Sequence, residues 1–167
     1  MAFNDEVDQI YLGAEKSVRR AARAAGVGGD WSPAATWPLF TITGGPVRIT
    51  SLFGHVIALF AGTATPTLWY NTLTPTASAL CTIAVAHAWT VNEILAWDGL
   101  LGSALIATIG EGHGQTTGTN QGFAAGGIIC LPGSIDMING IADATGQVDW
   151  YLTYQPLRAG AIVTPIP

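Results

Sequence analysis

Residues 49–92 of this chain contain no aspartate, glutamate, lysine or arginine. Charged residues make up 10% of the whole chain, compared with about a quarter of an average soluble protein. The segment 51–70 is apolar enough to pass a hydropathy criterion for a membrane helix. It nevertheless contains Gly54, Gly62 and Pro66 together with serines and threonines. We therefore expect a pair of buried strands there and no association with a membrane.

The chain after residue 36 shows the pattern of short strands separated by turns. Near the C-terminus, Val148, Trp150, Leu152 and Tyr154 alternate with more polar residues. This period of two predicts a strand with one buried face. Ten segments are predicted strands: 37–43, 47–60, 67–73, 77–86, 94–98, 104–109, 123–131, 134–141, 147–155 and 161–164.

Short strands with frequent turns favour a mainly β fold. We expect an antiparallel β-sandwich or jelly roll over residues 37–167. A parallel α/β fold would need crossover helices, and the sequence of this part shows no pattern for them. The length of 167 residues fits one such domain with an appendage at its N-terminus.

The first 25 residues predict a single helix before the β domain. Asn4 is a favourable N-cap, and acidic residues follow it in the first turn. Arg19, Arg20 and Arg23 suit the negative end of the helix dipole, and Gly26 is well placed to end the helix. The acidic N-terminus also predicts that no secretion signal is present.

We divide the chain into a helical arm (1–25), a glycine-rich linker (26–36) and a β-sandwich domain (37–167). The apolar residues of the arm recur at the three-and-four spacing of one helical face, which must pack on a partner. The sequence leaves open whether this partner is the chain's own body or a neighbour. The predicted partner-binding residues of the arm are Val7, Ile10, Tyr11, Ala14 and Val18.

The arm also holds most of the positive charge. Four of the six basic residues are Lys16, Arg19, Arg20 and Arg23, and the rest of the chain carries two bases against seven acids. A protein that binds DNA or RNA needs a basic face to neutralise phosphates. We therefore expect no nucleic acid among the partners of the β domain.

The motifs of common enzyme classes are missing. A phosphate-binding P-loop needs a lysine after its second glycine, and the only lysine is Lys16. No Gly-x-Ser-x-Gly motif occurs. Cys81 and Cys130 have apolar neighbours, which predicts two buried and unreactive thiols, and the sequence leaves open whether a disulfide joins them. We expect no catalytic residue, no cofactor and no enzymatic activity.

The histidines do not form a metal-binding motif. His55, His87 and His113 are far apart in the sequence and lack the close spacing of zinc ligands. Glu111 and His113 share the glycine-rich segment 110–122, which we interpret as a solvated loop, so no metal site is predicted. Three aspartates in or beside predicted strands are expected to face solvent or to satisfy turns: Asp98, Asp136 and Asp149.

Two adjacent aromatic pairs, Trp69-Tyr70 and Trp150-Tyr151, lie in predicted strands. Consecutive side chains of a strand point to opposite faces, so one aromatic of each pair should leave the core. Aromatic residues are enriched in protein interfaces, and they form the binding platforms of sugar-binding β-sandwiches. We therefore regard these four residues as candidate interface aromatics.

Two stretches carry a family resemblance. The first is Gly-Gly-Pro-Val-Arg-Ile-Thr-Ser-Leu-Phe-Gly at 44–54. The second runs from Leu-Pro-Gly-Ser-Ile-Asp at 131–136 through Ala-Thr-Gly-Gln-Val-Asp-Trp-Tyr-Leu-Thr-Tyr-Gln-Pro-Leu at 144–157. Both resemble strands of small virion proteins of tailed bacteriophages. The resemblance implies a structural part of the particle, such as a capsid decoration (cement) protein, a head fibre or a tail component, and it supplies no functional residues.

We therefore expect a phage capsid decoration protein that binds the shell as a symmetric homotrimer. Its partners would be the major capsid protein or other virion proteins. It would be made in the host cytoplasm and would lie on the capsid surface, or else in the tail. Two alternatives remain open: a receptor- or glycan-binding module of a fibre or tail that uses exposed aromatics and the loop 110–122, and a tail-tube or connector subunit.

Overall fold

The computed structural model describes residues 14–23, 31, 36–72, 78–81, 88–97, 99, 101, 106–108, 126–141 and 143–167. This part of the chain is mainly β, as the sequence predicts. Its strands are β1 (Lys16–Arg20), β2 (Thr36–Thr43), β3 (Val47–Ala58), β4 (Pro66–Thr72), β5 (Ser78–Cys81), β6 (Ile94–Ala96), β7 (Ile106–Thr108), β8 (Ile128–Cys130), β9 (Gly133–Asn139), β10 (Gln147–Pro156) and β11 (Ile162–Pro165).

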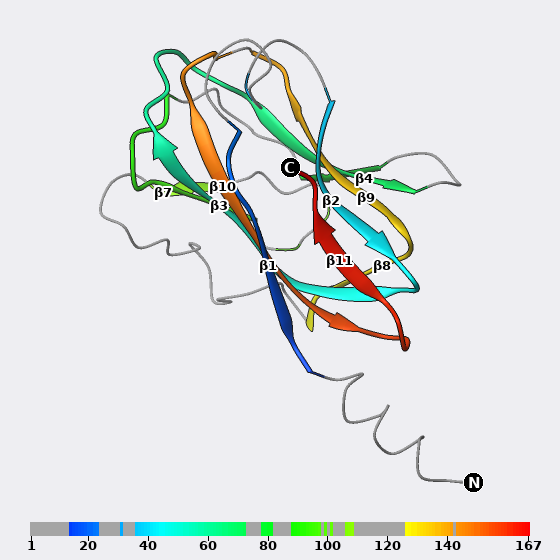
Figure 1. Ribbon diagram of the computed structural model, residues 1–167. Coiled ribbons are helices and arrows are strands. Elements are labelled where there is room, and N and C mark those ends of the chain that lie inside the picture. Colours follow the sequence, from blue (N-terminus) through cyan, green and yellow to red (C-terminus); the bar gives the residue numbers. More distant parts are fainter. Residues whose placement is uncertain are drawn as a thin grey trace, which may run out of the picture.

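The strands form two antiparallel sheets. The first sheet has the order β1-β10-β3-β6-β7, with β8 also paired to β3, and the second has the order β11-β2-β9-β4-β5. In Figure 1, β1, β10 and β3 lie side by side in one layer, and β11, β2 and β9 lie in the other. The first four strands alternate between the sheets, so neighbours in sequence are seldom neighbours in a sheet.

Each of the ten predicted segments overlaps a strand in the described part of the chain, and where both ends are described the boundaries shift by at most two residues. The apolar segment 51–70 runs from β3 into β4, which are the predicted pair of strands. Parts of the predicted segments 77–86, 104–109 and 123–131 lie outside the described residues. Among the residues that are described, no helix is long and apolar enough to cross a membrane.

The prediction of an N-terminal helix is wrong for the part of the arm that the structure describes. Residues 16–20 form β1, which pairs with β10 from Lys16 opposite Tyr154 to Arg20 opposite Trp150. A lone helix of this length has only marginal stability, whereas β1 gains a ladder of backbone hydrogen bonds to a long, buried strand. Tertiary pairing therefore outweighs the local helical signals. Residues 1–13 lie outside the described part of the chain.

One hydrophobic core lies between the two sheets. Leu52, Trp150 and Leu152 contribute to it from the first sheet, and Phe40 and Ile135 contribute from the second. Each of these side chains is almost fully buried. The core fixes which residues of each strand face inward, and the alternate residues then face outward.

An aromatic cluster closes one end of the core. The rings of Trp31, Phe60 and Trp89 pack edge to face, with centroids 4.8 Å, 5.5 Å and 5.0 Å apart in the pairs 31–60, 31–89 and 60–89. Trp31 belongs to the segment predicted as a linker, yet it is buried in the core. The core therefore includes a residue from outside the predicted β domain.

Candidate functional site

The outer face of the first sheet is the main candidate for an interaction surface. On β10, Trp150 and Leu152 point into the core, and Tyr151 between them points outward. The strand register places Tyr151 opposite Phe53 of β3 on one side and opposite Arg19 of β1 on the other. Three strands thus contribute side chains to one outer row.

Aromatic and aliphatic side chains continue along the outer side of β3. The rings of Phe53 and Tyr151 stack with centroids 5.0 Å apart and planes inclined by 13°. The next outward residues are His55, which is half-buried, and Ile57, which is 40% exposed. We call Phe53, His55, Ile57 and Tyr151 the β3 face. Outward apolar and aromatic side chains of this kind are typical of protein interfaces.

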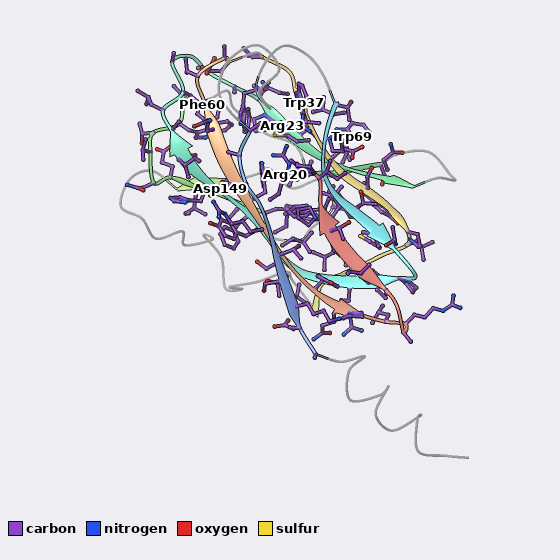
Figure 2. The ribbon with its side chains drawn as sticks, viewed as in Figure 1. Arg20, Arg23, Trp37, Phe60, Trp69 and Asp149 are labelled. Carbon is purple, nitrogen blue, oxygen red and sulfur yellow. The ribbon has the colours of Figure 1, made fainter. Side chains whose placement is uncertain are left out.

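A buried carboxylate holds β1 beside this face. Asp149 Oδ2 accepts hydrogen bonds from Arg19 Nε at 3.1 Å and Nη2 at 2.5 Å, and Oδ1 accepts one from the backbone N–H of Ala22 at 2.8 Å. The side chain of Asp149 is 5% exposed and that of Arg19 is 56% exposed. The hydrogen bond and the charge of Asp149 raise the pKa of the Arg19 guanidinium above its ordinary value. We call Arg19, Ala22 and Asp149 the Asp149 latch (Figure 2).

The neighbouring basic residues also bind the body. Arg20 is buried, and its Nε donates a hydrogen bond to the carbonyl of Ile166 at 2.9 Å. Arg23 donates a hydrogen bond to the carbonyl of Pro167, and its guanidinium carbon lies 5.2 Å from the ring centroid of Trp37. Figure 2 labels Arg20, Arg23 and Trp37 in this region. The basic residues that the sequence assigned to a helix end therefore attach β1 to the acidic body.

The structure describes two of the five predicted partner-binding residues of the arm. Val18 lies on β1 and packs against the chain's own core. Ala14 precedes β1 and is exposed. Val7, Ile10 and Tyr11 lie outside the described residues. The partner-binding role of these residues stays a prediction.

The prediction that each aromatic pair spans the two sides of a sheet is confirmed. Trp150 is fully buried in the core, and Tyr151 faces outward. Tyr70 packs against the core and donates its hydroxyl to the carbonyl of Leu131 at 2.8 Å, so Trp69 faces outward from the second sheet. Burial raises the pKa of the Tyr70 phenol. The role of these aromatics in an interface stays a prediction.

Two aspartates depart from the expectation that they face solvent or satisfy turns. Asp149 is the latch carboxylate. Asp136 lies on the outer side of β9, opposite Trp69 of β4 and Pro38 of β2. Asp136 is 4% exposed, and within the described part of the chain its Oδ1 has no hydrogen-bond partner. Asp98 lies outside the described residues.

The sequence contains a signal that would have singled out Asp136 and Asp149, two of the three buried aspartates in the described part of the chain. The body has few charges, and acidic side chains in the interior of a strand are unfavourable unless they have partners. Asp136 and Asp149 stand within strands, not in turns. A carboxylate placed there, in a chain that elsewhere avoids charge, indicates a specific contact.

The two cysteines are buried, as the sequence predicts, and no disulfide joins them. Burial raises the pKa of the Cys130 thiol to about 12, whereas a nucleophilic cysteine needs a lowered pKa. In the described residues, no group of three histidine, cysteine or acidic side chains lies together as a metal site would require. The segment with Glu111 and His113, and also His87, lies outside the described part.

Comparison with known proteins gives no family for this chain. No protein-family model, no curated protein and no solved structure matches it. Its function must therefore be argued from the β3 face, the Asp149 latch and the outer face of the second sheet.

Proposed function

We propose that this protein is a structural, non-enzymatic subunit of a tailed-phage particle, namely a capsid decoration protein that binds the shell as a homotrimer. The observation that carries the proposal is the β3 face, an outward aromatic and aliphatic surface beside a latched N-terminal strand. Such a surface loses water favourably when it meets a protein of complementary shape. The partners would be the major capsid protein or other virion proteins, on the capsid surface or in the tail.

The strand order supports a finer interpretation of the fold as a jelly roll. The four strands β1-β10-β3-β6 of the first sheet oppose β2-β9-β4-β5 of the second. This wiring, in which the chain crosses repeatedly from one sheet to the other, is typical of the jelly rolls found in viral capsid and lectin domains. A fold by itself does not determine a function, so the proposal rests on the β3 face.

Charge supports a protein partner for the β3 face over a nucleic acid. None of the four residues of the face is an acid or a permanent base, and the centres of protein interfaces are likewise depleted of charged residues. The latch binds Asp149 to Arg19 at the edge of this face, so the acidic side chain is compensated there. The remaining acids of the body would repel phosphates.

The N-terminal segment would provide a second contact. The Asp149 latch fixes β1 on β10, so the chain before Lys16 starts from a fixed point at the edge of the first sheet. The sequence of that segment carries the apolar residues Val7, Ile10 and Tyr11. An arm that is anchored in this way can reach a neighbouring subunit and add to the affinity of the β3 face by avidity.

Co-sedimentation with purified particles stripped of this protein tests the proposal. We expect the double variant Phe53→Ala, Tyr151→Ala to bind the particles at least about 10-fold more weakly, since buried aromatics dominate interface energies. Deletion of residues 1–13 should also weaken binding, and it keeps β1 in place. Deletion of residues 1–30 would not test the arm, because it also removes β1 and leaves Asp149 without its donors.

The exposed Arg158 provides the control, and Arg158→Ala should bind as the wild type does. Undiminished binding of both the aromatic double variant and the deletion, with the folds checked by circular dichroism, would refute the proposal. Native mass spectrometry tests the oligomeric state, for which we expect a trimer. Rings or tubes would instead support the tail-tube or connector alternative.

A further inference from the structure

The outer face of the second sheet contains a buried carboxyl group beside an outward tryptophan. Asp136 stands on β9, the central strand of that sheet, and its cross-strand neighbours are Trp69 on β4 and Pro38 on β2. Directly opposed residues of neighbouring strands have their Cβ atoms about 5 Å apart. The Trp69 side chain, half-buried, therefore lies next to the Asp136 carboxyl group.

The Asp136 carboxyl group is costly where it stands. It is 4% exposed, and its Oδ1 meets no hydrogen-bond donor in the described part of the protein. Buried polar atoms are nearly always hydrogen-bonded, and a buried carboxylate oxygen without a donor is destabilising. By contrast, Asp149 is equally buried but accepts hydrogen bonds from Arg19 and Ala22. Positions that break such a rule are often functional.

The side chains around Asp136 are neutral hydrogen-bonding groups. Asn71, Ser134 and Thr41 form the next outward row across β4, β9 and β2. This row lies two residues along the strands, about 7 Å from Asp136. Thr67 lies on the other side of Trp69 along β4. A tryptophan, a carboxyl group and several amide and hydroxyl groups are thus spread over one outer sheet face.

We propose that this surface, which we call the Asp136 face (Trp69, Asn71, Ser134 and Asp136), binds a carbohydrate. The indole of Trp69 would pack against the apolar face of a sugar ring, and Asp136 would accept hydrogen bonds from the ring hydroxyls. Asn71 and Ser134 would bind further hydroxyls along the strands. Because the carboxyl group is covered, binding requires a rearrangement of side chains, such as a rotation of Trp69, which is common at interfaces.

A ligand with one positive charge is the competing choice for a carboxyl group beside tryptophan. Such a ligand would need only Trp69 and Asp136, whereas the surrounding neutral groups extend over a second row of the sheet. A polyhydroxylated ligand uses both rows. The observations therefore favour a sugar over an ammonium or guanidinium group.

The Asp136 face and the β3 face lie on the outer sides of different sheets. One subunit can therefore dock on a shell through the first sheet and keep the second sheet available for a glycan. This inference does not depend on the shell-binding proposal. Particle binding and sugar binding are measured separately, with variants that lie on different sheets.

The test begins with the full chain on a microarray of immobilised bacterial and eukaryotic oligosaccharides. The strongest soluble oligosaccharide is then titrated calorimetrically against the wild type and the variants Trp69→Ala and Asp136→Asn. We expect each variant to lose at least about 10-fold in affinity, in line with the loss of an aromatic anchor or a charged acceptor. Tyr70→Phe is the matched control on the same strand, and because Tyr70 faces the core it should bind the sugar normally.

Thermal unfolding separates a binding role of Asp136 from a structural one. Asparagine has the same shape but no charge to bury, so Asp136→Asn should raise the midpoint of unfolding by about 2–4 °C while it weakens sugar binding. A lower midpoint would show that Asp136 stabilises the fold, and would overturn the inference. Absence of any array signal above that of Trp69→Ala would also overturn it, as would preferential binding of tetramethylammonium in the same titration.

Discussion

Replacing Asp149 with asparagine should release β1 from β10 and leave the rest of the sandwich folded. The substitution keeps the shape of the side chain but removes the charge that Arg19 contacts and the second acceptor oxygen. In the wild type, the two carboxylate oxygens accept three hydrogen bonds from Arg19 and Ala22. An asparagine can offer only one oxygen, and its NH2 group would face a donor.

The expected loss of free energy that holds β1 on β10 can be worked out from the less exposed part of the Asp149 latch. The hydrogen bond from the Ala22 N–H to a charged acceptor is worth about 1.5–3 kcal/mol, compared with about 0.5–1.5 kcal/mol for a hydrogen bond to the neutral oxygen that asparagine still offers. The contact with Arg19 adds little to this estimate because that side chain is largely exposed and screened by solvent. The difference of about 1–1.5 kcal/mol corresponds to a roughly 5- to 13-fold larger equilibrium constant for local opening of β1.

Hydrogen exchange measured by mass spectrometry checks this prediction. The peptide that contains Lys16–Arg20 should exchange faster by that factor in Asp149→Asn, and peptides from β9 in the centre of the second sheet should be unchanged. Glu15→Gln is the matched control, because it replaces an exposed acid just before β1. Unchanged exchange of β1, or an equal acceleration of every strand, would refute the role that we assign to the latch.

Two further predictions concern stability. Burial raises the pKa of Asp143, but hydrogen bonds from Thr145, Gly62 and Gly146 outweigh it, so the net pKa is lowered. Asp143 therefore stabilises the fold above the pKa of the unfolded state and loses this effect as pH falls through the lower folded pKa. In urea unfolding, Asp143→Asn should have a lower free energy of unfolding than the wild type near neutral pH, and the two free energies should converge in strong acid. A difference in free energy that stays constant with pH would contradict this prediction. A Cβ atom at Gly54 would lie 2.7 Å from a methyl group of Val148. Gly54→Ala should therefore lower the free energy of unfolding by about 1–3 kcal/mol in the same assay. An unchanged midpoint of urea unfolding would show that the core has room for the methyl group.

The sequence by itself determined ten of the eleven strands in the described part of the chain. The alternation of Val148, Trp150, Leu152 and Tyr154 with more polar residues predicts β10 and its buried face correctly. The same pattern locates both members of each aromatic pair, because side-chain direction in a strand depends only on position. Burial of apolar residues at every second position is a local property, so it can be recognised without knowledge of the partners.

Only the tertiary structure decided that residues 16–20 of the arm form a strand and that Asp136 and Asp149 are buried. The first residues of β1 carry helical signals, yet the pairing of β1 with β10, residues far away in the sequence, makes them a strand. Asp149 is buried because Arg19 comes to it from that strand and Ala22 from the residues that follow the strand. Asp136 is buried because Trp69 and Pro38 flank it in the sheet. These outcomes depend on contacts between distant segments, and such contacts leave no periodic pattern in the sequence.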